Sequence, residues 1–102
     1  MSDFCRLFQA ISDKQRQKIL WHLQEKDCSV GELVDLFHLS QSSISKHLAV
    51  LRNAGLVEDE RRGQQVFYSL HCENLKTFCQ EYFQRFECCH GLFVDKEEKT
   101  AI

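Results

Sequence analysis

The sequence predicts one mainly α-helical domain that carries a small β-hairpin. Its 102 residues leave room for a single hydrophobic core, and 43% hydrophobic with 27% charged residues is typical of a globular chain. Apolar residues recur every three or four positions over most of the chain, which contains no proline. Residues 65–70 instead alternate apolar and polar side chains in part, and with residues 56–60 they predict a pair of strands.

Two helices are expected near the N-terminus. Aromatic and aliphatic residues at helical spacing predict the first: Phe4, Leu7, Phe8 and Ile11. Ser12 followed by Gln15 has the form of a capping box and should start the second helix, which ends at Lys26-Asp27. The buried face of this second helix is expected to hold Ile19, Leu20 and Leu23, and Trp21 is also expected in the core.

Two shorter helices follow and give the first functional signal. Ser29 and Glu32 repeat the capping-box pattern, so a third helix should run to His38. Its expected inward residues are Val30, Leu33, Leu36 and Phe37. Ser40 can cap a fourth helix that ends at Gly55 and whose apolar residues lie on one side only: Ile44, Leu48 and Leu51. Two short helices joined by a tight turn, the second with a polar outer face, form the helix-turn-helix pattern that reads duplex DNA.

A hairpin and a last helix complete the predicted domain. Residues 56–60 and 65–70 flank residues 61–64, which include two arginines, so the hairpin should have a basic tip. A stripe at helical spacing then predicts one long helix of four turns: Cys72, Leu75, Phe78, Cys79, Tyr82, Phe83, Phe86 and Cys89. This stripe is too aromatic to face water, so we expect the first and last helices to pack together across a dimer interface.

Charge and cysteine content limit the classes of function. Thirteen Lys and Arg against fifteen Asp and Glu give a formal charge of -2, so nucleic-acid binding must come from local geometry rather than general attraction to phosphates. The sequence has no apolar run of membrane-span length and no secretory start, so we expect a cytoplasmic protein without a membrane partner. In that reducing compartment the six cysteines should be free thiols. The sequence has neither a redox Cys-x-x-Cys motif nor a phosphate-binding glycine loop, so it is not expected to be an enzyme.

Several segments together resemble a known family. They are Ile11-Ser12-Asp13 with Arg16 and Ile19-Leu20, residues 39–48 (LSQSSISKHL), residues 51–57 (LRNAGLV), Arg62-Gly63 and Val66-Phe67-Tyr68. The combination is similar to the ArsR/SmtB winged-helix repressors of bacteria, which leave their operators when a metal, metalloid or sulfur species binds. The resemblance covers roughly residues 4 to 89.

The resemblance implies a winged helix-turn-helix homodimer on double-stranded operator DNA. Residues 1–91 would bind DNA and dimerise, and residues 92–102 would form a charged, flexible tail. Each recognition helix would enter a major groove while each wing touches the flanking backbone, and no cofactor is needed for this binding. The expected DNA contacts are Gln41, Ser42, Ser43, Ser45, Lys46, His47, Arg61, Arg62 and Gln64. A two-fold dimer predicts an imperfect palindrome, whereas the alternative is a dimerisation module whose polar helix face is only solvated.

Departures from the family pattern narrow the choice of inducer. Members with Cys-Val-Cys in the third helix would place thiols where this chain has Ser29 and Gly31. Members that sense zinc would place their ligands where this chain has Cys72, Asn74, Arg85 and Cys88. Asparagine is a poor zinc ligand and arginine is none, so a typical zinc site is not expected. The remaining candidates are the neighbouring thiols Cys88 and Cys89. Paired thiolates suit soft ions, and the resemblance favours As(III), with Sb(III) and Cd(II) as alternatives.

The third ligand of such a site and the role of the other thiols stay open. Cys5 of the partner subunit, His90 or a small exogenous thiol could complete the site. Cys79 would lie about 13 Å from Cys88 along a straight helix, beyond the reach of a shared metal. It is expected to be a small buried hydrophobe, as are the two further thiols Cys28 and Cys72.

A thiol switch is the second interpretation of the cysteine pair. Oxidation or persulfide formation at Cys88 or Cys89 would lower DNA affinity without a metal. The family's sulfur sensors pair a last-helix Cys with one in the second helix, where this chain has Trp21, and that difference counts against this alternative.

Overall fold

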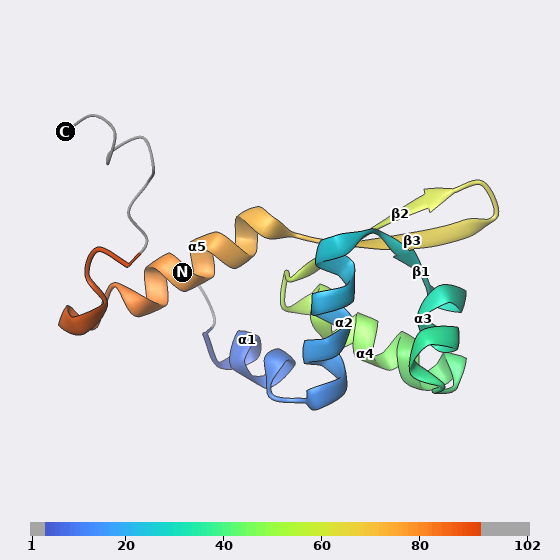
Figure 1. The fold of residues 1–102 in the computed structure, drawn as a ribbon, viewed down its shortest axis with the longest axis horizontal. Helices are drawn as coiled ribbons and strands as arrows, with labels where there is room; N and C mark the ends of the chain where they lie inside the picture. Colours follow the sequence, from blue (N-terminus) through green and yellow to red (C-terminus); the bar gives the residue numbers. More distant parts are fainter. Residues whose placement is uncertain (1–3, 93–102) are drawn as a thin grey trace.

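The computed structural model describes residues 4–92 and shows a mainly helical chain with a small antiparallel sheet (Figure 1). The elements are α1 (Phe4–Ile11), α2 (Lys14–Glu25), β1 (Cys28–Ser29), α3 (Val30–Phe37), α4 (Gln41–Asn53), β2 (Val57–Arg62), β3 (Gln65–Leu70), α5 (Cys72–Phe83) and the 3-10 helix η1 (Glu87–Cys89). The strand order is β1-β3-β2. The predicted fold class, mainly α with a hairpin, is confirmed, whereas all of the predicted tail except Leu92 lies outside the described residues.

One core joins the helices to the sheet. Its most deeply buried residues are Ile19, Leu33, Ile44, Leu48, Leu51, Leu56 and Cys28. Because these come from α2, β1, α3, α4 and the residue just before β2, their burial joins the helix-turn-helix and the base of the hairpin in one body. Within residues 4–92, no helix has the length and apolar character that crossing a membrane requires.

The helix-turn-helix has the caps that the sequence predicts. The Ser29 hydroxyl accepts a hydrogen bond from the Glu32 backbone N–H at 3.2 Å, and the Ser29 N–H donates to the Glu32 carboxylate at 2.9 Å. His38 ends α3 in the left-handed region at φ 55°, and Ser40 caps α4 by accepting from the Ser43 N–H at 3.0 Å. These contacts set the turn between the two helices.

The predicted cap of α2 is wrong by one residue. Asp13, not Ser12, is the N-cap, and its carboxylate accepts from the N–H groups of Gln15 at 2.8 Å and Arg16 at 3.1 Å. Ser12 instead donates to the Gln9 carbonyl at the end of α1. A carboxylate attracts the positive end of the helix dipole more strongly than a hydroxyl does, which favours this arrangement.

Two residues that were expected inside lie at the surface. Trp21 is 60% exposed and Leu36 is 52% exposed. In α2 the buried residues Ile19 and Leu23 define the inner face, and Trp21 lies about 200° around the helix from Ile19, so it points outward.

The hairpin is tighter than predicted and has a third strand beside it. β2 continues through Arg62, which pairs with Gln65, so the turn consists of Gly63 and Gln64 only. Gly63 takes φ 64°, a conformation that suits glycine in two-residue turns. β1 was missed because two residues are too short to show a periodicity; its pairs are Cys28 with Tyr68 and Ser29 with Phe67.

The last helix is shorter than predicted. α5 ends at Phe83, and the chain turns before η1, so Cys88 and Cys89 are not on the long helix. The first and last helices do pack together, but they do so within one subunit: ring centroids of Phe8 and Tyr82 lie 4.9 Å apart, and those of Phe4 and Phe78 lie 5.8 Å apart. Phe78 and Tyr82 of the aromatic stripe are thus covered, at least in part, by α1 of the same chain.

Candidate DNA interface and thiol pair

The predicted recognition helix, α4, presents a polar face. Ile44, Leu48 and Leu51 take the inner side of the helix. The outer and flanking positions carry exposed side chains: Gln41, Ser42, Ser45 and Lys46. Hydroxyl, amide and ammonium groups of this kind can meet phosphates and base edges in a groove.

Two other predicted contacts on α4 are half-buried and already have partners. Ser43 belongs to the cap, because its hydroxyl lies 3.1 Å from that of Ser40. The His47 Nδ1 lies 3.3 Å from the Arg16 guanidinium. Since arginine has only donors, this contact is a hydrogen bond when the Nδ1 of His47 is the acceptor, and in that tautomer the ring has its N–H at Nε2. His47 can therefore offer an N–H donor to DNA while Arg16 holds its ring.

Arg16 is a site residue for which the sequence analysis assigned no role. Its Nε donates to the Ala10 carbonyl at 2.7 Å and its Nη2 donates to the Gln9 carbonyl at 3.0 Å. One side chain therefore connects the end of α1 to His47 on α4. Hydrogen bonds from the Arg16 and Gln15 N–H groups, opposed in part by burial, lower the pKa of the Asp13 carboxyl below its usual value. The signal that could have found Arg16 was its place in the family resemblance.

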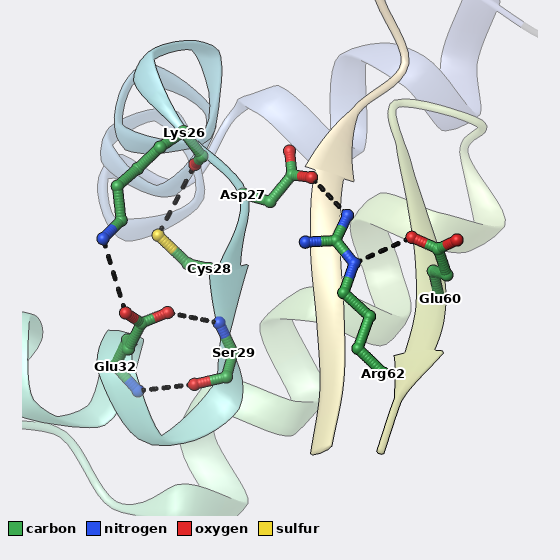
Figure 2. A network of polar contacts seen from close by, with 7 residues as sticks. All are labelled: Lys26, Asp27, Cys28, Ser29, Glu32, Glu60 and Arg62. Atoms are coloured by element: carbon green, nitrogen blue, oxygen red, sulfur yellow. Dashed lines mark hydrogen bonds and ion pairs between the residues drawn. The ribbon is translucent and has the colours of Figure 1, made fainter. Parts of the chain in front are cut away.

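The two arginines of the wing, residues 57–70, differ in environment. Arg61 is exposed, and among residues 4–92 no ion pair involves it. Arg62 donates to Asp27 at 2.6 Å and to Glu60 at 2.9 Å (Figure 2). Those hydrogen bonds raise the pKa of the Arg62 guanidinium, so it stays a cation. Gln64 is exposed at the turn.

The cysteine pair lies on η1, away from the core. The sulfur atoms of Cys88 and Cys89 are 3.9 Å apart, and Cys88 is exposed while Cys89 is half-buried. Desolvation and then the neighbouring Cys88 thiol raise the pKa of the Cys89 thiol. His90 is next to them, but its Nε2 lies 2.9 Å from the Gln84 carbonyl and is engaged there.

The three predicted metal ligands do not meet in one subunit. Cys5 is exposed on α1, and within the part of the chain that the structure describes no three His, Cys, Asp or Glu side chains gather as a metal site. Of the thiols expected to be buried, Cys28 is buried and Cys79 is half-buried, and desolvation raises the pKa of both, whereas Cys72 is exposed. The expectation for Cys72 is therefore wrong.

Comparison with known proteins agrees with this arrangement. Residues 13–59, from the α2 cap to β2, match the family model described as bacterial regulatory protein, arsR family. The chain is 43% identical over 65 residues to the transcriptional repressor SdpR of Bacillus subtilis, covering 64% of this chain and 72% of that protein. It is 40% identical over 82 residues to the transcriptional activator HlyU of Vibrio cholerae, covering 80% and 75%.

A solved structure and an arsenic-related relative extend the comparison. The structure of HlyU from Vibrio cholerae superposes with a TM-score of 0.64 at 39% identity, covering 82% of this chain and 90% of that one. The arsenic resistance transcriptional regulator ArsR1 of Pseudomonas putida is 43% identical over 68 residues, which cover 66% of this chain and 53% of that protein.

The fold and the polar recognition helix define the class: a winged helix-turn-helix DNA-binding protein. The matched domain and relatives identify the group within that class, and the chain belongs to the ArsR family of bacterial transcriptional regulators.

Proposed function

We propose that the chain is a homodimeric repressor that occupies a palindromic operator and that thiol chemistry at Cys88 and Cys89 releases it. The observation that carries the DNA-binding part is the exposed polar face of α4. In this proposal Gln41, Ser42, Ser45 and Lys46 enter the major groove, and His47 adds its Nε2–H donor. Ser43 acts mainly through the cap, and Arg61 and Gln64 contact the flanking backbone.

The dimer is proposed from the surface that the chain leaves uncovered. α5 projects from the body with α1 beside it (Figure 1). Apolar side chains on and beyond these helices are partly exposed: Phe8 at 37%, Phe86 at 44% and Leu92 at 65%. A second copy applied to this surface would cover them and would place two α4 helices on successive grooves.

Selection of duplexes from a random pool tests the DNA-binding part. We expect recovered sites to have two related half-sites about one helical turn, or a multiple, apart.

Lys46→Gln should weaken binding and reduce the slope of log K against log salt by about 0.9 for each subunit. Lys76→Gln, an exposed lysine on α5, is the matched control and should leave the slope unchanged. A protein that binds no duplex at low salt would instead be a dimerisation module.

As(III) is the inducer that we propose first. Arsenous acid can condense with the two thiols, forming two S–As bonds and releasing two water molecules, and a third thiol can displace the remaining hydroxyl as water. The sulfur separation of 3.9 Å lets both thiols reach one soft ion. Because residues 4–92 of one subunit assemble no three-ligand site, the third thiol would be Cys5 of the partner subunit or an exogenous thiol. The name of the Pseudomonas putida relative refers to arsenic resistance, which supports this choice.

Titration of the DNA-bound protein tests the inducer. Arsenite, antimonite, cadmium, zinc and a persulfide donor are compared in the parent and in Cys88→Ser/Cys89→Ser. We expect arsenite to release the parent and not the double variant, with Cys72→Ser as the control that responds normally. Cys5→Ser should weaken arsenite binding if the partner supplies the third sulfur. A double variant that still responds like the parent would show that the site lies elsewhere.

A thiol switch is the second candidate, and the exposure of Cys88 favours it. A persulfide donor can transfer its outer sulfur to the Cys88 thiol and leave as a thiol, which would add one sulfur atom to the subunit mass and needs no metal. A disulfide between adjacent residues is strained, so the pair itself should form one poorly. Release by the persulfide donor, with the expected mass increase on Cys88 and no response to arsenite, would favour this candidate.

A further inference from the structure

Arg62 spans one face of the sheet. Its side chain starts on β2, and its guanidinium carbon lies 4.9 Å from the centroid of the Phe67 ring on β3. Beyond that ring it reaches Asp27, just before β1, while its Nε bonds Glu60 on its own strand (Figure 2). One side chain therefore crosses the sheet and connects two segments that are 35 residues apart in sequence.

The segment that carries Asp27 is firmly held. The Lys26 N–H donates to the His22 carbonyl and ends α2, and the Lys26 ammonium lies 3.4 Å from Glu32. Cys28 and Ser29, which follow, are buried, and the Ser29–Glu32 capping box fixes the start of α3. Figure 2 shows the Lys26–Glu32 ion pair and the Ser29–Glu32 capping box, whose residues precede and follow Asp27 in the sequence. Asp27 is therefore an anchor on the body of the protein.

The outer part of the wing has little else to hold it. β1 ends at the pair Ser29–Phe67, so residues 61–66 pair only with one another. A two-stranded hairpin is marginally stable by itself in water. An ion pair between its outermost strand residue, Arg62, and the body would restrict its motion.

The Arg61 side chain points to the face of the sheet opposite that of Arg62, because successive residues of a strand point to opposite faces. Asp59 shares the face of Arg61 and lies 3.4 Å from Arg52 near the C-terminal end of α4, whereas Arg61 itself is exposed and is in none of the ion pairs among residues 4–92. We infer that Arg61 is the arginine of the wing that contacts DNA, whereas Arg62 is a tether and Asp27 is the positioning residue that holds the wing through it. The DNA half of this inference rests on the proposed function.

Salt dependence of operator binding separates the two arginines. Each phosphate contact contributes about 0.9 to the slope of log K against log salt. Arg61→Gln should lower the slope by about that amount for each subunit, and Arg62→Gln should leave it unchanged. An Arg62→Gln variant whose slope falls as much as that of Arg61→Gln would overturn the assignment.

Hydrogen exchange of the wing amides, residues 64–66, tests the tether without DNA. Asp27→Asn and Arg62→Gln should each speed exchange about two- to five-fold, the range expected for an exposed ion pair, and the double variant should add nothing further. Glu60→Gln keeps the link to the body and should change exchange less, while Asp35→Asn, an exposed carboxylate on α3, is the charge-matched control.

The charge swap Asp27→Arg/Arg62→Asp should restore slow exchange. Unchanged exchange in Asp27→Asn would refute the tether. If no duplex is bound, the proposed function fails, but the exchange measurement still decides the role of Asp27.

Discussion

At the scale of single residues, Arg16 organises the surface that the sequence assigned to α4. Its guanidinium bonds two carbonyls at the end of α1 and the ring of His47. Without the Arg16 side chain the neighbouring helices would keep their apolar contacts. The Gln9 and Ala10 carbonyls at the end of α1 and the His47 ring would, however, lose a charged hydrogen-bond donor. The orientation of a predicted DNA contact therefore depends on a residue two helices away.

We expect Arg16→Gln to lower the free energy of unfolding by about 1–3 kcal/mol, the cost of leaving hydrogen-bond acceptors of a charged donor unpaired. Operator affinity should also fall, because the His47 ring loses its support. Urea unfolding measures the first effect and a binding titration the second. Lys18→Gln, an exposed neighbour on α2, should change stability by less than about 0.5 kcal/mol. Equal stability of the two variants would contradict the role of Arg16.

The thiol pair gives a prediction about pH. Cadmium binds thiolates, so it must displace the proton of a thiol that is still protonated. Because the pKa of Cys89 is raised, that thiol stays protonated through neutral pH, and affinity should keep rising with pH beyond it. We expect log K for Cd²⁺ to rise with pH near neutrality, and the rise per pH unit to be smaller by about one in Cys89→Ser, which has lost that proton. Isothermal titration at several pH values measures this, and a flat profile would place the metal elsewhere.

At the scale of elements, the sequence predicted what depends on neighbouring residues. The Ser29 and Ser40 caps involve contacts only three residues apart, so their residue types were sufficient. The end of α5 was missed because apolar residues continue at helical spacing as far as Cys89, although the helix ends at Phe83. The partners of Arg62 were missed because Asp27 is brought to it only by the strand order.

The turn between α3 and α4 predicts a stabilising substitution. His38 takes φ 55°, a left-handed conformation that costs a residue with a side chain roughly 1–2 kcal/mol relative to glycine. His38 is exposed, so little packing is lost on its removal. We expect His38→Gly to raise the free energy of unfolding by about 0.5–1 kcal/mol, after allowing for the extra freedom of glycine in the unfolded chain.

Urea unfolding measures this effect, and Gly55→Ala is the converse control. Gly55 has φ 80°, and an added Cβ would lie 3.1 Å from the Asn74 amide, so that variant should be less stable than the parent. A loss of stability in His38→Gly would mean that the imidazole contributes more than the strain costs.

At the scale of the whole molecule, the helix-turn-helix and the proposed dimerisation surface have different sources of stability. The helix-turn-helix is stabilised by the hydrophobic core between its own helices and the sheet. Helix α5 instead packs against the aromatic rings of α1, and Phe86, which follows it, stays partly exposed. The sequence predicted that the aromatic stripe must be covered but could not divide it between the chain and a partner. The structure shows that Phe78 is covered within the chain, whereas Phe86 at the C-terminal end of the stripe is 44% exposed and is the part that the proposed dimer would cover.

Phe86→Asp should therefore dissociate the proposed dimer. A partly exposed aromatic residue at the centre of an interface contributes about 2 kcal/mol or more, so the dimer dissociation constant should rise about 30-fold or more. Leu36→Asp makes the same kind of change at an exposed apolar residue on α3 and should leave the protein dimeric. Sedimentation equilibrium gives the dissociation constants of the parent and both variants.

Because a lone subunit contacts one half-site, the salt slope for operator binding by monomeric Phe86→Asp should be about half that of the parent. A parent that sediments as a monomer, or a Phe86→Asp variant as dimeric as Leu36→Asp, would show that this end of the stripe is not the interface.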